Sequence, residues 1–103
     1  MFTPHYCNEN TDRLVKSLLT LQTEDEVYRF LEDVLTIQEM KAITQRLQVA
    51  EMLRSKETYQ DIVRQTGAST TTIGRVNRSL QYGAEGYQLV LDRLHAQDEN
   101  TQK

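Results

Sequence analysis

Within this 103-residue chain, the segment most indicative of the fold is Thr58-Tyr-Gln-Asp-Ile-Val-Arg-Gln-Thr-Gly67-Ala-Ser-Thr-Thr-Thr-Ile-Gly-Arg-Val-Asn-Arg-Ser79. A glycine separates two short segments within it, and apolar residues stand at fixed offsets on both sides of that glycine. The apolar positions are Ile62, Val63, Ala68, Ile73 and Val76. Two short helices held at a steep angle need such a turn, together with apolar residues that pack them on each other. The stretch therefore predicts a helix-turn-helix over about residues 58–80.

The side chains left exposed on the second of these helices have the chemistry to read DNA. They are Ser69, Thr70, Thr71, Gly74, Arg75 and Arg78. Hydroxyl groups can donate to or accept from either kind of base pair, and arginine can bond guanine through two hydrogen bonds or hold a phosphate. A helix N-terminus also offers free amides to a phosphate. We expect base contacts from Thr70, Thr71, Gly74 and Arg78. Contacts to the DNA backbone are expected from Arg54, Tyr59, Gln60 and Arg64.

The distribution of charge favours contact with a polyanion, although the whole chain carries a net charge of −3 at pH 7. Residues 54–78 hold five basic and two acidic side chains, so this segment carries +3 and the remainder carries −6. Because lysine and arginine dominate DNA affinity by neutralising phosphates, such a chain attracts DNA to one face and repels it from the others. One alternative stays open here, a helical hairpin within an ordinary bundle, in which the glycine only caps a helix.

Apolar residues at helical spacing precede this stretch and predict three helices. The first is expected over residues 10–21, with Asn10 or Thr11 as its cap. Thr23 and Thr36 each open a capping box, with a glutamate three residues later, so a second and a longer third helix begin there. The apolar stripe of the third helix is expected at Met40, Ile43, Leu47, Ala50 and Leu53.

The C-terminal half predicts three more helices and no strand. A fourth helix is expected from Thr58 to Gly67, because glycine adopts the left-handed conformation that ends a helix at little cost. Ser69 or Thr70 is expected to cap the fifth. Residues 82–86 interrupt the pattern, and a sixth helix follows. The predicted fold class is therefore all-α, with six helices.

Composition places the chain among ordered soluble domains, with 38% hydrophobic and 26% charged residues. We expect a single domain over residues 1–103, with a flexible N-terminus at residues 1–9 and a flexible polar tail at residues 97–103. No apolar run approaches the ~20 residues that span a bilayer, and the N-terminus lacks the regions of a signal peptide. Cys7 is the only cysteine, which fits a cytoplasmic protein.

Residues suited to catalysis or to metal binding are sparse. His5 and His95 stand at opposite ends of the sequence, and neither has a cysteine at metal-ligand spacing. The sequence also holds no phosphate loop, nucleophile elbow or pair of catalytic carboxylates. We therefore expect no enzyme activity, no metal site and no cofactor.

From Leu35 to Leu94 the sequence resembles the Trp repressor superfamily, and within it the YerC/YecD group of Trp repressor-related proteins. The residues that match are Leu35-Thr36-x-x-Glu39-x-x-Ala42-Ile43-x-x-Arg46, Tyr59-x-x-Ile62, Thr66-Gly67-Ala68-Ser69-x-x-Thr72-Ile73-x-Arg75-Val76 and Ser79-Leu80-x-Tyr82-Gly83. The resemblance implies a Trp repressor-like fold that forms an intertwined homodimer, in which the N-terminal helices of both chains share a core. A two-fold dimer would place two recognition helices in major grooves ~34 Å apart, so its operator should be a pseudo-palindrome.

The resemblance also implies an effector pocket. Trp repressor holds tryptophan between two arginines, with a serine one turn beyond the second, and Arg46, Arg75 and Ser79 match these positions. Thr36 matches a threonine near that site. Val76, however, stands where the tryptophan-binding members carry glycine, and its side chain should occupy space that the indole requires. A tryptophan corepressor is therefore not expected.

The leading hypothesis is a dimeric, sequence-specific regulator of transcription that binds double-stranded DNA, a repressor by analogy with the family, and unresponsive to tryptophan. Two alternatives remain open. One is a helical protein-interaction module with a vestigial helix-turn-helix, which the acidic remainder of the chain would permit. The other is a DNA-binding sensor of another small molecule, bound in the pocket near Arg46.

Overall fold

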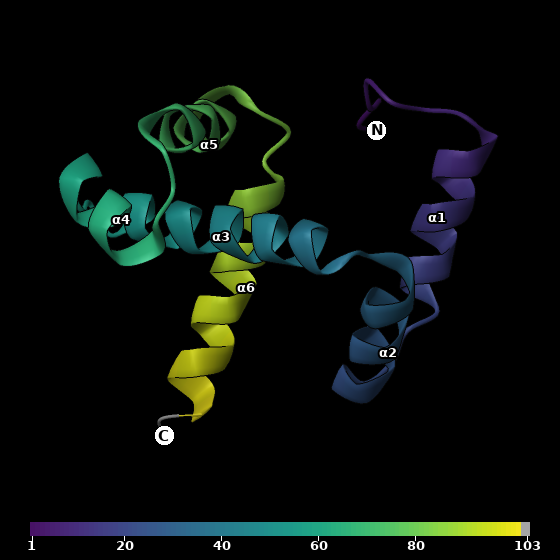
Figure 1. Cartoon of the computed structure of the whole chain (residues 1–103). Helices are drawn as coiled ribbons and strands as arrows, with labels where there is room; N and C mark the ends of the chain where they lie inside the picture. The colour runs from purple at the N-terminus through teal and green to yellow at the C-terminus, as the bar shows by residue number, and fades with distance from the viewer. Residues whose placement is uncertain (102–103) are drawn as a thin grey trace. The chain divides into compact units, whose positions relative to one another are not determined.

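A computed structural model describes residues 1–101 of the chain, and these residues form six α-helices and no strand (Figure 1). The helices are α1 (Glu9–Leu19), α2 (Glu24–Val34), α3 (Ile37–Arg54), α4 (Tyr59–Thr66), α5 (Thr70–Tyr82) and α6 (Gly86–Thr101). The predicted all-α class is confirmed. None of the helices in this part of the chain is long and apolar enough to cross a membrane.

Side-chain caps begin the first two helices. Asn8 caps α1, with its Oδ1 accepting from the Thr11 N–H at 2.8 Å, so the predicted caps Asn10 and Thr11 were wrong by one turn or less. Asn8 is the cap because its backbone is extended, as a capping residue requires, whereas the residues that follow it are already helical. At α2 the predicted capping box forms, although the Glu26 carboxylate accepts from the N–H of Gln22 rather than from that of the capping threonine.

Thr36 and Glu39 form the predicted capping box at the start of α3. The Glu39 N–H donates to the Thr36 hydroxyl at 3.1 Å, and the Thr36 N–H donates to the Glu39 carboxylate at 2.9 Å. The backbone hydrogen bond and then the side-chain hydrogen bond from Thr36 lower the pKa of Glu39 below its ordinary value, because both favour the ionised carboxylate. The chain direction at the beginning of α3 is therefore fixed by residues adjacent in sequence.

Contacts within the chain divide it into two compact units, residues 1–40 and the residues from Lys41 onward, with the boundary inside α3. We refer to them as the N-terminal unit and the C-terminal unit. The prediction of a single domain over residues 1–103 stays a prediction.

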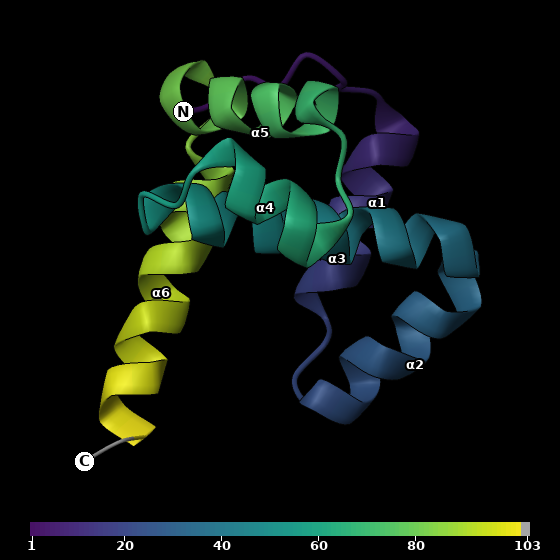
Figure 2. The ribbon, with the colours of Figure 1, turned by 60° about the vertical axis from the view of Figure 1, so that its left-hand side comes forward.

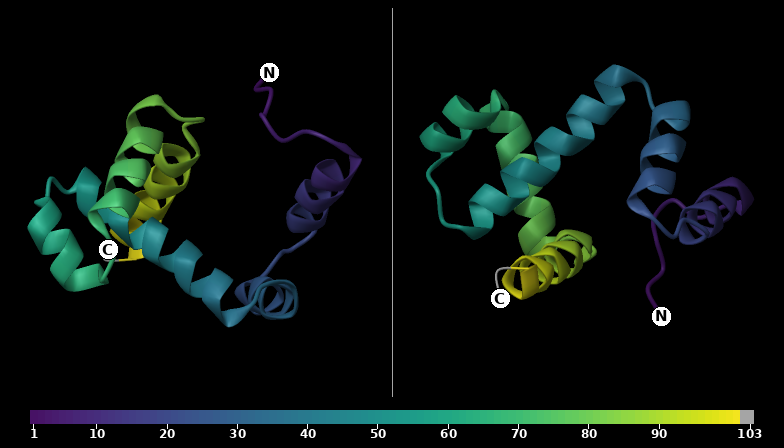
Figure 3. Two further views of the ribbon diagram at one scale, coloured as in Figure 1. Left: turned by 45° about the horizontal axis from the view of Figure 1, so that its top comes forward. Right: turned by 90° about the horizontal axis from the view of Figure 1, so that it is seen from below.

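The buried core of the described residues lies entirely in the C-terminal unit. It consists of Val49, Ala50, Met52, Ile62, Ala68, Ile73, Val76 and Leu91, contributed by α3, α4, the turn after α4, α5 and α6. Figures 1 and 2 show α5 and α4 beside the C-terminal half of α3. Helix α6, seen along its length in Figure 1 and nearly end-on in the right panel of Figure 3, contributes Leu91 to the same core. This packing holds the helix-turn-helix against α3.

Two predictions about this core were wrong. Val63 was expected to pack the two helices together, but its side chain is 36% exposed because it lies on the outer face of α4. On α3, Val49 and Met52 are buried although they lie outside the predicted stripe, whereas Ile43 from that stripe is 43% exposed. Because α3 is covered from more than one side, its buried residues span a wider arc than one stripe.

The N-terminal unit exposes its apolar side chains instead of burying them. Neither α1 nor α2 contains a buried residue. The exposed apolar residues of these helices include Leu14, Val15, Leu18, Leu19, Val27, Tyr28 and Val34. Both helices are amphipathic, so each carries an apolar face that the N-terminal unit itself does not bury.

Helix α6 is longer than predicted. It continues through Gln97 to Thr101, whereas the sequence predicts a flexible polar tail from residue 97. Polar residues between 97 and 101 extend the helix because a solvated helix end needs no apolar face. Residues 102 and 103, the rest of the predicted tail, lie outside the described residues.

Candidate nucleic-acid interface

The turn between α4 and α5 has the geometry of a helix-turn-helix. Gly67 ends α4 in the left-handed region at φ 74°. The Thr66 hydroxyl donates to the Ile62 carbonyl at 2.7 Å and accepts from the Ala68 N–H at 3.0 Å, so the turn is braced on both sides of the glycine. Ser69 then caps α5 by accepting from the Thr72 N–H at 3.1 Å. The predicted turn glycine and the serine cap are therefore confirmed.

A side chain from α3 also anchors the turn. The Gln45 amide donates to the Thr66 carbonyl at 3.1 Å, and the bond is partly buried. Gln45 and Thr66 are 21 positions apart in sequence, so no local pattern could have revealed this contact. It ties the end of α4 to α3 and helps to fix how α5 is presented.

We call α5 the recognition helix because its exposed surface carries the residues expected to contact DNA. Ten candidates were predicted in α3, α4, the turn and α5, and all are exposed except Gly74, which is half-buried. These are Arg54, Tyr59, Gln60, Arg64, Ser69, Thr70, Thr71, Gly74, Arg75 and Arg78. The Ser69 hydroxyl is engaged in the cap and in a hydrogen bond with the Thr72 hydroxyl at 3.1 Å, which leaves Thr70 and Thr71 as the free hydroxyls of the first turn.

The four candidate arginines differ in their partners. Arg54 Nη2 lies 2.7 Å from Asp92 Oδ1, and Arg64 Nη2 lies 2.6 Å from Asp61 Oδ1. Within residues 1–101, neither Arg75 nor Arg78 has an ion pair or a side-chain hydrogen bond. The guanidinium groups of the recognition helix are therefore available to an external anion, whereas the other two are engaged within the chain.

Three of the four predicted effector residues meet at one pocket of the C-terminal unit, with a volume of about 320 Å³. Arg46 from α3 and Arg75 and Ser79 from α5 line it, and Val76 forms part of its wall while its side chain is only 3% exposed. Thr36 belongs to the N-terminal unit, where its hydroxyl caps α3. The pocket therefore combines two cationic side chains with an apolar wall.

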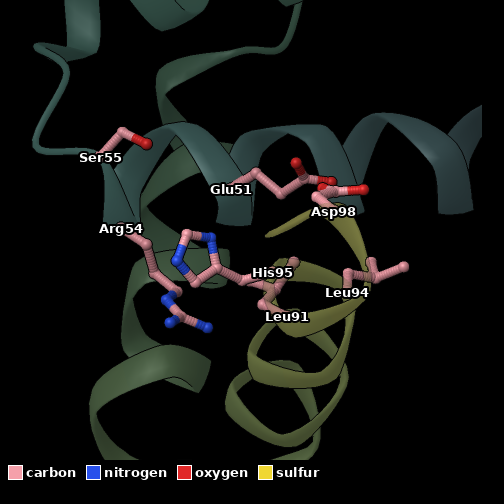
Figure 4. A pocket seen from close by; sticks show the side chains of 7 residues that line it. All are labelled: Glu51, Arg54, Ser55, Leu91, Leu94, His95 and Asp98. Atoms are coloured by element: carbon pink, nitrogen blue, oxygen red, sulfur yellow. The ribbon is translucent and has the colours of Figure 1, made fainter. Parts of the chain in front are cut away.

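A second pocket, of about 280 Å³, lies between the end of α3 and α6 (Figure 4). Figure 4 shows Arg54 extending from α3 and His95 extending from α6 at its edge. Both side chains already have partners, since Arg54 pairs with Asp92 and His95 Nε2 lies 3.1 Å from Glu99 Oε1. Sequence reasoning did not single out this pocket. No cluster of three potential metal-ligating side chains occurs in the part of the chain that the structure describes.

The six helices, the turn at Gly67 and the unpaired arginines of α5 define a helix-turn-helix protein. A model of the Trp repressor protein family matches residues 9–95, and the chain belongs to this family. The protein YerC of Bacillus subtilis (strain 168) is 49% identical over 83 residues, covering 81% of this chain and 80% of YerC. The resemblance to the YerC group is therefore confirmed.

Two solved structures show the same fold. A TrpR-like protein from Eubacterium eligens is 50% identical, with a TM-score of 0.81, over 85% of this chain and 91% of that chain. A protein from Staphylococcus aureus is 43% identical, with a TM-score of 0.82, over 86% of this chain and 89% of that chain. Trp repressor-like proteins are DNA-binding regulators of transcription rather than enzymes, and this chain shares their fold.

Proposed function

We propose that this protein is a sequence-specific repressor that binds double-stranded DNA as a dimer at a pseudo-palindromic operator. The observation that carries the proposal is the surface of the recognition helix. Thr70, Thr71, Arg75 and Arg78 are exposed there, and no other side chain of the described residues pairs with these arginines. The buried Ile73 and Val76 on the opposite face hold the helix to the core. Such a helix can enter the major groove with its first turns against the base edges.

The exposed apolar surfaces support a dimer. The N-terminal unit leaves Leu14 and Leu18 of α1 about half exposed. In the C-terminal unit, Ile43, Leu47 and Val90 line an apolar groove of about 540 Å³. Apolar surface of this extent on a monomer marks an interaction site, and a second copy of the chain offers matching apolar faces. Trp repressor is itself a helix-turn-helix protein that docks two recognition helices ~34 Å apart, and we propose the same arrangement here.

We further propose that tryptophan is not the effector. Val76 lines the pocket between Arg46 and Arg75 with its side chain almost fully buried, so its methyl groups take up space at the pocket wall. Moving this side chain aside would disturb the core in which it packs with Ile73. Calorimetric titration with L-tryptophan should show no heat of binding, and micromolar binding would overturn this part of the proposal.

The DNA-binding claim is tested by a mobility shift on a random DNA pool at low salt. The wild-type protein should retard a subset of the pool, and the double variant Arg75→Ala, Arg78→Ala should lose that retardation because it removes the two unpaired cations of α5. The control is Lys41→Ala, Arg93→Ala, which removes the same charge from α3 and α6 and should bind as the wild type does. Equal retardation by both double variants contradicts the proposal and favours a protein-interaction module.

The pocket itself supports one second candidate, a DNA-binding sensor of a small anionic molecule. Arg46 and Arg75 flank it without an acidic partner among the described residues, so a carboxylate or phosphate could bind between them. A screen of metabolites by thermal shift tests this candidate, since a ligand at a hundred times its Kd stabilises the fold by about 2.7 kcal/mol. An Arg46→Ala variant should lose the shift produced by any hit.

A further inference from the structure

Gly74 stands in the interior of the recognition helix without a structural reason for being glycine. Glycine weakens a helix interior relative to alanine because its backbone loses more freedom on folding. A Cβ atom built at Gly74 would meet no atom within 4 Å, and the backbone there is not in the left-handed region. Alanine would therefore fit the fold and strengthen the helix.

At two other glycines of the C-terminal unit, the structure does require glycine. Gly67 has φ 74°, which disfavours any residue with a side chain. At Gly83 an added Cβ would collide with the carbonyl oxygen of Ser79. Gly74 shares neither feature. No backbone conformation or close contact within the chain therefore compensates for the helix stability that this glycine loses relative to alanine.

The gap at Gly74 opens onto the surface that we propose for DNA. Thr70 and Arg78 stand four residues before and after Gly74, and Thr71 stands three before it, so all four positions share one face of the helix. The two threonines and Arg78 are exposed. A missing side chain at the centre of this face allows an external surface to approach the helix backbone closely.

Arg78 is the side chain placed to use this gap. Helical side chains lean toward the N-terminus of their helix, so the surface that a residue covers lies over the preceding turn. For Arg78 that surface is the one at Gly74. The Arg78 guanidinium has no partner in residues 1–101, so it is free to bond an external acceptor there.

We propose that Gly74 is the point of closest approach between this chain and the floor of the DNA major groove, and that its missing side chain lets Arg78 bond the edge of a guanine. Guanine presents two acceptors in the major groove, O6 and N7, which match the paired donors of a guanidinium. The inference rests on the proposed function, because it names which residue of the DNA-binding surface selects the base. Gly74 is then a specificity-determining position, where glycine lowers the stability of α5 and raises its affinity for DNA.

The test compares Gly74→Ala with the wild type on the DNA sequence that the wild type selects. Gly74→Ala should raise Tm by about 4 °C, since alanine is the better helix former. The same variant should bind the selected DNA about tenfold more weakly and lose its preference for guanine at the contacted position. The control is Arg93→Ala in α6, an exposed position outside the surface proposed for DNA, and its affinity should equal that of the wild type.

Arg78→Ala and a modified base identify the contact itself. Arg78→Ala should weaken binding to the selected DNA about tenfold in the wild-type background, and much less when Gly74→Ala is already present. Replacing the contacted guanine by 7-deazaguanine removes the N7 acceptor, so it should weaken the wild type but leave Arg78→Ala unchanged.

The outcomes separate this inference from the function on which it rests. If the wild type selects no sequence, both the proposed function and this inference fail. If the wild type selects a sequence and Gly74→Ala binds it with unchanged affinity, this inference alone fails. If Gly74→Ala weakens binding equally for all DNA sequences and keeps the preference for guanine, this inference is also contradicted.

Discussion

Arg75 and Arg78 differ from Arg54 and Arg64 in what surrounds them, although all four were expected to meet DNA. To reach a phosphate, Arg54 must leave Asp92, and Arg64 must leave Asp61. Exposed ion pairs contribute only about 0–1 kcal/mol, so neither pair prevents such a contact, but each reduces its net gain. The two unpaired arginines should therefore contribute more to DNA affinity than the two paired ones.

The ionisation of Glu39 should make the stability of the fold depend on pH. Its folded-state pKa is lowered by the hydrogen bonds from Thr36, so its carboxylate adds stability above the pKa that it has in the unfolded chain. That contribution is lost as the pH falls through the lower, folded-state pKa. Titration of the Glu39 side-chain carboxyl by NMR should give a pKa below that of an ordinary glutamate.

The variant Glu39→Gln provides the control for this pH dependence. It keeps an acceptor for the Thr36 N–H but carries no charge. Its Tm should lie below that of the wild type near pH 7, and the difference should shrink as the pH falls through the folded-state pKa of Glu39. A constant difference at every pH would show that the ionised carboxylate contributes nothing through this box.

At the scale of the element, the helix-turn-helix was predictable because its determinants are local. Gly67 ends α4, and Ser69 begins α5 two residues later, each through bonds to residues within four positions of itself. The sequence could not show the packing of α3, because the burial of Val49 and Met52 depends on helices that follow much later in the chain. The Gln45 contact to Thr66 was missed for the same reason.

In the candidate site, too, the features set by local sequence were predictable and those set by distant residues were not. The exposed residues of α5 followed from the apolar positions on its other face, so periodicity was enough to find Thr70, Thr71 and Arg78. The ion pair of Arg54 was not predictable, since it joins positions 54 and 92 across α3 and α6. The difference between Gly74 and Gly83 depends on surrounding atoms that only the structure shows.

Removal of the Ser69 cap tests whether this residue stabilises the start of α5. Ser69→Ala should lower the free energy of unfolding by about 1 kcal/mol, because it leaves the Thr72 N–H without its acceptor. Thr70→Ala, one residue later, should change it by much less, since its side chain caps nothing. Chemical denaturation of both variants measures the two effects, and an equal loss would contradict the assignment of Ser69 as the cap.

At the scale of the whole molecule, burial is uneven. Every buried residue among those described lies in the C-terminal unit, whereas α1 and α2 of the N-terminal unit bury none. A chain that keeps two amphipathic helices without burying their apolar faces gains little stability from them alone. We therefore expect a second copy of the chain to cover these faces.

A charge placed on the apolar face of α1 tests this expectation. Leu18→Glu should shift the protein from dimer to monomer in analytical ultracentrifugation, because it introduces a carboxylate into apolar contact surface. Binding to a two-half-site DNA should weaken about a hundredfold through loss of bivalency. Lys16→Glu, a charge reversal at an exposed position of the same helix, should leave the dimer intact. A wild-type monomer at the same concentrations contradicts the dimer.

Selecting bound DNA from a random pool and sequencing it shows whether the exposed face of α5 reads DNA in a two-fold arrangement. We predict enrichment of two inverted half-sites whose centres are about one helical turn apart, about 10 base pairs. The double variant Arg75→Ala, Arg78→Ala should enrich none. An unchanged pool after selection with the wild type, or the same enriched sequence from the double variant, would contradict DNA reading by α5.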